Sequence, residues 1–378
     1  MTRKAESTIP VPKILLLGIQ APYNKIQNIE GYFQEFLNLA HSNEIEAEHT
    51  LFIKLRDINP AHFLTKGKLE ELKEYCNKHN IEEVVISEPL TAQQERNLSD
   101  LLNCRVFDRT QLILEIFEKS AHSAEGKTQV EIAMLQYRKS RLAGKGIHLA
   151  QQVGVFGLRG GPGETIKEQE TRHIDQQILK LKKQLKRIEQ SRKTQRKRRL
   201  CSAFPLISLI GYTNAGKSTI LNVLTKSNVL AEEKLFATLD TTTRTLVINS
   251  TKVGLISDTV GFIQLLPHQL IEAFKSTLAE LRYADLLLLI IDSADPNWED
   301  HINVVHQILN ELAIDKPILY VFNKIDKIEK QSELFEQFNR YEPNVFVSAI
   351  SPNELNQLKD YLLEHKPKFV PADRTVTR

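Results

Sequence analysis

Cysteine is scarce in this chain of 378 residues. Cys76, Cys104 and Cys201 are its only cysteines, and they form neither a CxxC pair nor a group with nearby histidines. A disulfide framework needs pairs of cysteines, and a structural zinc site needs several cysteine or histidine ligands at short spacings. The sequence argues against both, and we expect three inert thiols.

Long apolar runs are also missing. The longest, residues 284–291, is much shorter than the roughly 20 residues that a membrane-spanning helix requires. The amino terminus carries Arg3 and Lys4, but only a short apolar stretch and no cleavage site follow. Apolar residues make up 41% of the chain and charged residues 26%, which is typical of a globular protein with two or three domains. We expect an unprocessed cytoplasmic protein that acts as a monomer.

Acidic residues are almost absent from residues 180–199, which contain eleven Lys or Arg and one Glu. This local charge of +10 lies in a chain of net charge +3, so the other residues are net negative. Two interpretations stay open. The block is either a solvated helix face or a surface that binds a polyanion such as RNA.

No acidic residue at all occurs in residues 143–163, which hold seven of the fifteen glycines. A long segment without regular structure inside a folded protein is usually functional or disordered. Glycine lets the backbone approach a ligand closely, and Lys145 and Arg159 add positive charge. We expect a loop that touches nucleic acid, with a simple flexible connector as the alternative. His148 is not expected to be catalytic or to bind metal.

The first 110 residues alternate between two patterns. Strand-like stretches at 13–20, 49–55, 81–87 and 104–108 are separated by helical ones at 26–42, 67–80 and 91–102. This alternation predicts a small α/β domain over residues 1–110, with helices on the faces of its sheet. Nothing in it resembles a catalytic constellation.

A long helical hairpin is predicted for residues 111–200, with 143–163 as its tip. Its first arm reaches residue 142 with a kink at Gly126, and its second arm covers 164–199. Apolar residues of the second arm repeat at spacings of 4, 3, 4 and 3, which is a heptad seam that needs a partner helix. The seam is formed by Ile174, Ile178, Leu181, Leu185 and Ile188, and the first arm offers Val130, Met134 and Tyr137.

The stretch GYTNAGKST, residues 211–219, follows an apolar strand and opens a helix. It matches the phosphate-binding pattern GxxxxGK[ST] in the strand–loop–helix context that the pattern requires. Backbone N–H groups of such a loop hold phosphates, Lys217 reaches the β and γ oxygens, and Ser218 ligates Mg²⁺. Residues 201–368 are therefore predicted to form a nucleotide-binding domain, followed by a tail at 369–378.

Later motifs specify the base. Asn323, Lys324 and Asp326 end a further apolar strand, and an Asp at this place accepts from both donors of guanine while the Lys covers the ring. Backbone amides at Ser348 and Ala349 are placed to meet the guanine O6. The motifs lie at strand ends in the correct order, which predicts a GTP site on a doubly wound, mostly parallel sheet.

The two remaining motifs respond to the γ-phosphate. Residues 232–249 contain five threonines and hold the first switch loop, in which we choose Thr238 over Thr242 to close over Mg²⁺. The second is Asp258 to Gly261. The next residue of many such proteins is a Gln that orients the attacking water, but here it is Phe262. Either the chain hydrolyses nothing, or another group completes the site.

These residues together resemble the HflX family of ribosome-associated GTPases. The resemblance covers nearly the whole chain. It rests on segments outside the nucleotide motifs, which are GKLEEL (67–72), VFDRTQLILEIF (106–117), EGKTQVEIAMLQYRKSRLAG (125–144) and RGGPGE (159–164). It also rests on GYTNAGKST (211–219) and LFATLD (235–240) within those motifs. It implies a P-loop GTPase domain preceded by a small α/β domain and a long helical hairpin. It also implies slow hydrolysis until a partner binds, which agrees with the apolar residue after Gly261.

The resemblance assigns roles to residues and partners. It implies Lys217, Thr238 and Gly261 as catalytic, Mg²⁺ on Ser218 and Thr238, and GTP as substrate. The partner is the large (50S) ribosomal subunit with its rRNA, contacted through the amino-terminal domain, the basic helix 180–199 and the loop 143–163. The implied nucleotide ligands are Gly211, Tyr212, Thr213, Asn214, Ala215, Gly216, Lys217, Ser218, Phe236, Ala237, Thr238, Leu239, Asp240, Asp258, Thr259, Val260, Gly261, Asn323, Lys324, Ile325, Asp326, Ser348, Ala349 and Ile350.

The sequence departs from the family pattern at two places. Asp240 is followed by Thr241, where the family usually has Pro, and this change is expected to loosen the first switch without removing its Thr. The chain also ends at Arg378, soon after the last predicted helix, so we expect it to lack the small extra carboxyl-terminal domain of many members.

Three functions follow as hypotheses. The first is a Mg²⁺-dependent GTPase that the ribosome stimulates and that couples its nucleotide state to the splitting of stalled ribosomes. The second is a binding module in which GTP stabilises an RNA-docking conformer and hydrolysis is incidental, which Phe262 favours. A GTPase that modifies RNA is weaker, because no cysteine or acid–base constellation stands outside the GTPase domain. The sequence leaves open whether ATP is also hydrolysed, and which stalled state is the target.

Overall fold

A computed structural model of the chain describes residues 12–23, 28–142, 166–200, 204–225, 235–236, 242–265, 278–328, 332–351 and 354–369, without the side chains of 192–200 and of a few helix ends. Contacts between Cα atoms divide the chain into two compact units. The first comprises Met1–Ile116 and Tyr137–Arg172, and the second Phe117–Gln136 and His173–Arg378. The domain boundaries expected from the sequence remain predictions. No helix among the described residues is long and apolar enough to span a membrane.

The first unit contains a four-stranded parallel sheet with the order β2-β1-β3-β4. Its elements alternate as the sequence predicts: β1 Ile14–Gln20, α1 Ile29–Ser42, β2 His49–Lys54, α2 Lys66–His79, β3 Glu83–Ile86, α3 Ala92–Leu102 and β4 Arg105–Asp108. Helix starts follow capping chemistry. Thr91 caps α3 by accepting from the Gln94 amide, while the Gln94 side chain accepts from the Thr91 amide.

The next helices among the described residues are α4 Arg109–Ser120, α5 Ala124–Leu142 and α7 Ile166–Leu200. The kink predicted at Gly126 is wrong, because the chain breaks before α5 and not within it. The Ser123 hydroxyl accepts from the Gly126 amide at 2.9 Å, so Ser123 caps the new helix and Gly126 lies in its first turn.

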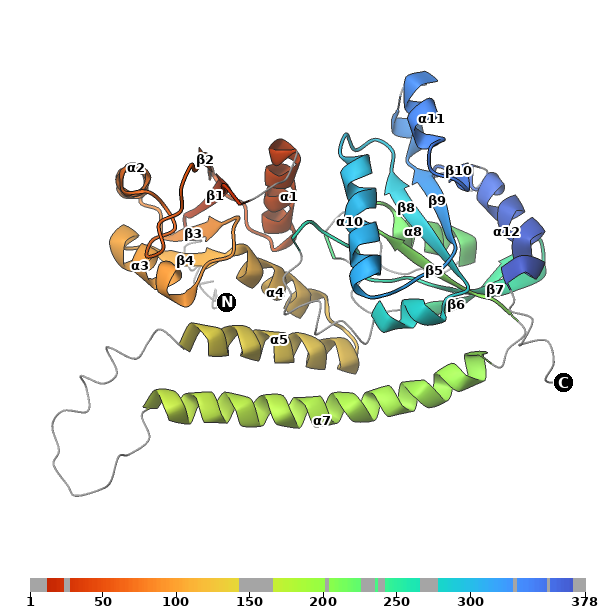
Figure 1. The fold of residues 1–378 in the computed structure, drawn as a ribbon, viewed down its shortest axis with the longest axis horizontal. Helices are drawn as coiled ribbons and strands as arrows, with labels where there is room; N and C mark the ends of the chain where they lie inside the picture. The colour runs from red at the N-terminus through yellow and green to blue at the C-terminus, as the bar shows by residue number, and fades with distance from the viewer. Residues whose placement is uncertain are drawn as a thin grey trace, which may run out of the picture. The chain divides into compact units, whose positions relative to one another are not determined.

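The seam on α7 is confirmed for four of its five residues, all but Ile188, whereas its partner face on α5 was misassigned. Buried Ile178 packs with Ile132 and Leu135 of α5, and α5 and α7 run antiparallel (Figure 1). The same cluster is joined by Ile174, Leu181 and Leu185. Tyr137, which the heptad spacing placed on this face, instead donates from its hydroxyl to Asp108 at 3.1 Å. Both faces of α5 are covered, so its pattern does not reveal which one meets α7.

The second unit contains a six-stranded sheet with the order β10-β9-β8-β5-β7-β6, in which only the β6–β7 pair is antiparallel. Its strands are β5 Leu206–Gly211, β6 Thr243–Ile248, β7 Thr251–Ser257, β8 Leu286–Asp292, β9 Ile318–Asn323 and β10 Asn344–Phe346. The described helices that alternate with these strands are α8 Lys217–Thr225, α10 Trp298–Glu311, α11 Ser332–Phe338 and α12 Asn356–Phe369, and short 3-10 turns lie at Ala279–Tyr283 and Ile325–Lys327. This confirms the predicted α/β fold with its doubly wound, mostly parallel sheet.

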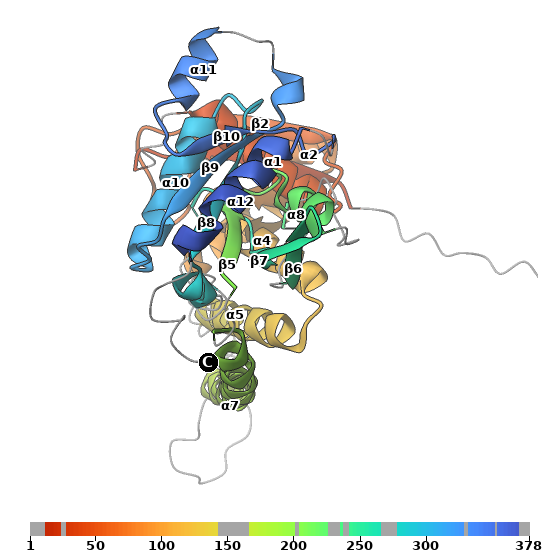
Figure 2. The same cartoon turned by 90° about the vertical axis from the view of Figure 1, so that its right-hand side faces the viewer.

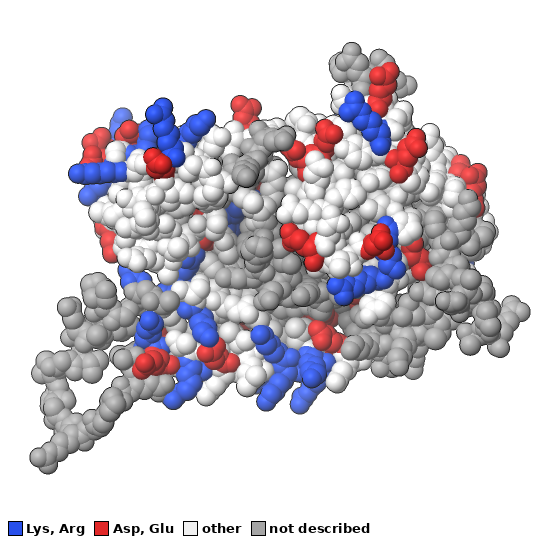
Figure 3. Space-filling model, in the orientation of Figure 1, with Lys and Arg blue, Asp and Glu red and all other residues white. Residues whose placement is uncertain are grey.

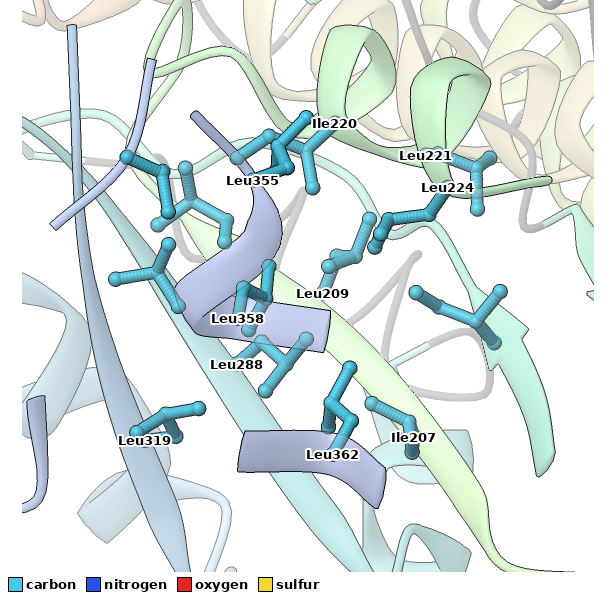
Figure 4. Packing of buried hydrophobic residues seen from close by; sticks show 14 of the residues in the cluster. Ile207, Leu209, Ile220, Leu221, Leu224, Leu288, Leu319, Leu355, Leu358 and Leu362 are labelled. Carbon is cyan, nitrogen blue, oxygen red and sulfur yellow. The ribbon is translucent and has the colours of Figure 1, made fainter. Parts of the chain in front are cut away.

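The core of this unit lies between one face of the sheet and helices α8 and α12. Leucine and isoleucine side chains of β5, β8 and β9 meet there with those of the two helices (Figure 4). Helix α10 covers the opposite face of the sheet (Figure 2). There Trp298 lies edge-on to Phe322 of β9. After β5, the chain first adds β6 and β7 on one side of β5 and then adds β8, β9 and β10 on the other side, so the strand order reverses at β5. A doubly wound sheet binds ligands at such a reversal, beyond the carboxyl ends of its strands.

Candidate functional site

The loop between β5 and α8 is held close to its neighbours. A Cβ atom on Gly211 would lie 2.3 Å from the Ile290 carbonyl oxygen, and one on Gly216 would lie 2.3 Å from the Asn323 side-chain nitrogen. Both glycines also have positive φ, +145° and +95°. Only glycine fits these two positions without strain, which explains their place in the loop.

Lys217 opens α8 and turns its ammonium back over the loop. Its Nζ donates to the carbonyl oxygens of Tyr212 at 2.6 Å and Gly211 at 3.2 Å. The side chain is buried, and this desolvation lowers its pKa to about 8, although the nearby Asp258 acts in the opposite direction. A buried cation above a loop of backbone N–H groups is suited to a phosphate.

Ser218 and Asp258 meet beside it. The Ser218 hydroxyl donates to the Asp258 carboxylate at 2.6 Å, and Asp258 is fully buried. A hydroxyl and a carboxylate are the hard oxygen ligands that Mg²⁺ prefers, and such sites usually keep only one or two protein ligands. The residues therefore fit the metal that the sequence predicts here.

The segment after Asp258 is joined to the phosphate loop. The Phe262 amide donates to the Gly211 carbonyl at 3.1 Å, and the Thr213 amide donates to the Phe262 carbonyl at 2.9 Å. The Phe262 ring is 1% exposed. The residue in the place of the water-orienting Gln is thus part of the core, and its backbone is held against the loop.

The base-binding motif is tied to the same loop. The Asn323 side chain donates to the Ala215 carbonyl at 2.9 Å and accepts from the Ala349 amide at 3.1 Å. The Lys324 ammonium donates to the Asn214 carbonyl at 2.9 Å.

The proposed base reader of this motif has a fixed side chain as well. Asp326 accepts from the Ser348 hydroxyl at 2.5 Å. The motifs therefore form one connected network, as their positions at strand ends predicted.

Several predicted residues lie elsewhere or outside the described residues. Thr238, with Ala237, Leu239 and Asp240, belongs to the latter group, as do loop 143–163 and the side chains of 192–199. Phe236 is described. Its ring is 2% exposed and packs edge-on to Phe117 with centroids 4.5 Å apart, so a nucleotide contact there falls to its backbone. Ile350 is 75% exposed. The assignment of individual nucleotide ligands remains a prediction.

Two features escaped the sequence analysis. Asp292, at the end of β8, accepts a hydrogen bond from Lys324 at 2.6 Å. It thereby holds in position the Lys side chain that is expected to cover the base. The sequence did contain a signal for this contact, because Asp292 is a charged residue at the end of an otherwise apolar strand. The second feature is the Tyr212 side chain, which stacks on His301 of α10 with ring centroids 3.7 Å apart. No local pattern indicates that contact.

The fold and this network define the class of protein: a P-loop GTPase, which binds and hydrolyses GTP. Three family models match, described as "GTP-binding GTPase N-terminal" over residues 30–118, "GTP-binding GTPase Middle Region" over 120–199 and "50S ribosome-binding GTPase" over 206–324. Relatives named GTPase HflX are 40–46% identical over 79–88% of this chain, so the chain belongs to the HflX family of GTPases.

Individual relatives agree with this assignment. GTPase HflX of Caldanaerobacter subterraneus is 46% identical over 79% of this chain and 70% of its own length. GTPase HflX of Escherichia coli is 40% identical over 88% and 78%. A solved structure described as the SsGBP and GDP complex is 25% identical, with a TM-score of 0.51, over 95% of this chain and 100% of that one.

Proposed function

We propose that this GTPase binds the large ribosomal subunit, that the ribosome stimulates its hydrolysis of GTP, and that its nucleotide state controls ribosome association and the splitting of stalled ribosomes. The match of residues 206–324 to a family described as 50S ribosome-binding supports the partner. A cytoplasmic location and a monomeric state belong to the same proposal.

The observation that carries the proposal is the position of Phe262. Its ring is buried and its backbone is paired with the phosphate loop, so this residue orients no attacking water. Orientation of the water is a main contribution of proteins of this class to a reaction that depends on positioning and electrostatics. A ribosomal group that completes the site explains why a chain with every other GTPase motif has an apolar residue here.

At the nucleotide, we assign roles that fit the geometry. Lys217 binds the β- and γ-phosphates, the Gly261 amide meets the γ-phosphate, and Asp326 reads the guanine. Ser218 binds Mg²⁺ directly, with Thr238 as the second protein ligand. When bound, the metal neutralises charge on the phosphates. The buried Asp258 holds the Ser218 hydroxyl for this task.

The basic face of α7 supports an RNA partner. The described part of the predicted block exposes five cations, and Figure 3 shows Lys and Arg side chains gathered over this helix. These cations are Lys180, Lys182, Lys183, Lys186 and Arg187. Phosphate contacts from such a face make binding depend strongly on salt.

A change of charge on this face tests the contact. Replacing Lys182, Lys183, Lys186 and Arg187 with alanine should weaken 50S binding and flatten its salt dependence, by roughly 0.7 to 0.9 in log–log slope for each lost phosphate contact. Arg340→Ala, at an exposed cation outside the hairpin, serves as the control. An unchanged slope in the α7 variant would leave the block as a solvated helix face.

The second candidate is a binding module in which GTP only stabilises the conformer that docks on RNA. Phe262 also favours this candidate, because slow hydrolysis is compatible with both. The variant Phe262→Gln tests whether the water is oriented by residue 262 itself or by a group of the ribosome. Because the side chain at this position is buried in the core, we expect no gain in hydrolysis by the free protein. A large gain without ribosomes would show that Phe262 alone limits turnover. Turnover that 50S subunits leave unchanged would favour the binding module.

A further inference from the structure

The phosphate loop and the segment after Gly261 are joined by three consecutive hydrogen bonds. Two are between backbone groups: Phe262 amide to Gly211 carbonyl, and Thr213 amide to Phe262 carbonyl. In the third, the Gln264 amide donates to the Tyr212 hydroxyl at 2.7 Å. Of these three bonds, only the last uses a side chain. A substitution of Tyr212 can therefore remove it without changing the backbone groups that form the other two bonds.

The Tyr212 hydroxyl is held in place from a separate element. Tyr212 is 6% exposed, and its ring lies parallel to that of His301 on α10, at an interplanar angle of 9°. Burial lowers the pKa of His301, so a neutral imidazole faces the phenol near neutral pH. The stack fixes the ring, and the ring fixes the point at which the Gln264 amide binds.

Small shifts of this segment matter because Gly261 lies tightly against the loop. A Cβ atom on Gly261 would be 2.9 Å from the Lys217 ammonium nitrogen and 2.8 Å from the Thr213 methyl carbon. The Gly261 amide is the group proposed to meet the γ-phosphate. The bonds made by the residues after Gly261 help to set the distance between the Gly261 amide and Lys217. Catalysis that depends on positioning is sensitive to displacements of about 1 Å.

We infer that Tyr212 is a positioning residue for GTP hydrolysis: its hydroxyl, oriented by the His301 ring, anchors the Gln264 amide and thereby holds Gly261 at the γ-phosphate. This role deepens the GTPase activity itself and does not depend on the ribosome. It differs from the expected contact of the Tyr212 backbone with nucleotide, which any residue at this position would make.

Tyr212→Phe removes the hydroxyl and keeps the ring, the stack and the backbone. We expect single-turnover hydrolysis of GTP by the free protein to fall about threefold to tenfold, the effect of losing one neutral hydrogen bond. The affinity for GDP, which has no γ-phosphate, should stay unchanged, and the melting temperature should fall by only about 2–4 °C. Tyr320→Phe is the matched control, because it removes another tyrosine hydroxyl of the same domain, one that bonds His306 of α10 at 3.0 Å and does not contact the segment after Gly261.

The stack provides a second, independent variant. His301→Ala should likewise lower GTP turnover and leave the affinity for GDP unchanged. His301→Phe should restore turnover, because it again provides a ring on which Tyr212 can stack. Turnover of Tyr212→Phe within twofold of the wild type, or above it, would overturn the inference. A parallel loss of GDP affinity would also overturn it, since the hydroxyl would then support the loop as a whole. None of these measurements includes ribosomes, so the outcome is separate from that of the proposed ribosome partner.

Discussion

A methyl group at Gly261 is the smallest change that tests the spacing between the second switch and the phosphate loop. In Gly261→Ala the new Cβ would lie 2.8 Å from the Thr213 Cγ2, and 2.9 Å from both the Thr213 Cα and the Lys217 Nζ. Ordinary carbon contacts begin near 3.4 Å. The segment must therefore move by about half an ångström, because the Thr213 Cα is backbone and cannot turn aside.

This movement should weaken the two backbone bonds that Phe262 makes with the loop. At about 1 kcal/mol for each bond, complete loss of both would lower GTP turnover about 30-fold, so we expect weakening to lower it by between about threefold and 30-fold. GDP binding should change little, because the displaced Gly261 amide faces only the γ-phosphate in the proposed site.

Single-turnover hydrolysis and calorimetric titration with GDP measure the two effects separately. Gly67→Ala in α2 is the control, since a Cβ there meets nothing within 4 Å. Turnover by Gly261→Ala within twofold of the wild type would refute the spacing argument. An equal loss of turnover and GDP affinity would place the damage in the loop instead.

Three further changes test other parts of the structure. Asp326→Asn should relax the preference for guanine, because an amide no longer accepts from both donors of the base; an unchanged margin over xanthosine triphosphate in competition binding would exclude Asp326 as the base reader. Ile178→Ala should lower the free energy of unfolding by about 2–4 kcal/mol, whereas Leu179→Ala, at a side chain 57% exposed, should change it by less than about 0.5 kcal/mol. Similar losses in urea denaturation would contradict the seam. Burial raises the pKa of Cys76 to about 12, so its thiol should stay protonated at pH 8 and alkylate slowly until denaturant is added; rapid alkylation of the folded protein would contradict this.

Local chemistry is what the sequence predicted well. The strand before Gly211, the helix after Lys217 and the order of the four motifs depend on apolar runs and on residues next to each other in the chain. The predicted fold class followed from the alternation of such runs. The break between α4 and α5 was placed wrongly because Gly126 was read as the disturbance. The cap at Ser123 is the actual helix start, and a glycine in a first turn is tolerated.

Tertiary contacts set the limit of prediction. Tyr212 meets His301 because β5 and β8 are neighbours in the sheet and α10 covers them, and that order is absent from any local pattern. Asp292 reaches Lys324 for a related reason, since β8 and β9 pair in register up to Asp292 and Asn323. In both cases the sequence predicted which strand or loop the residue belongs to, but its side-chain partner became clear only from the packing of the folded chain.

Phe262 leaves the hydrolytic site unfinished, and in the proposed function a ribosomal group completes it. The most direct test is GTP hydrolysis by the wild-type protein at a fixed nucleotide concentration, with and without purified 50S subunits, and with 30S subunits as the control. We predict that 50S subunits raise turnover at least about tenfold, as expected when a partner supplies a missing catalytic group, while 30S subunits do not. Equal turnover in all three conditions, with 50S binding demonstrated in the same samples, would contradict the claim.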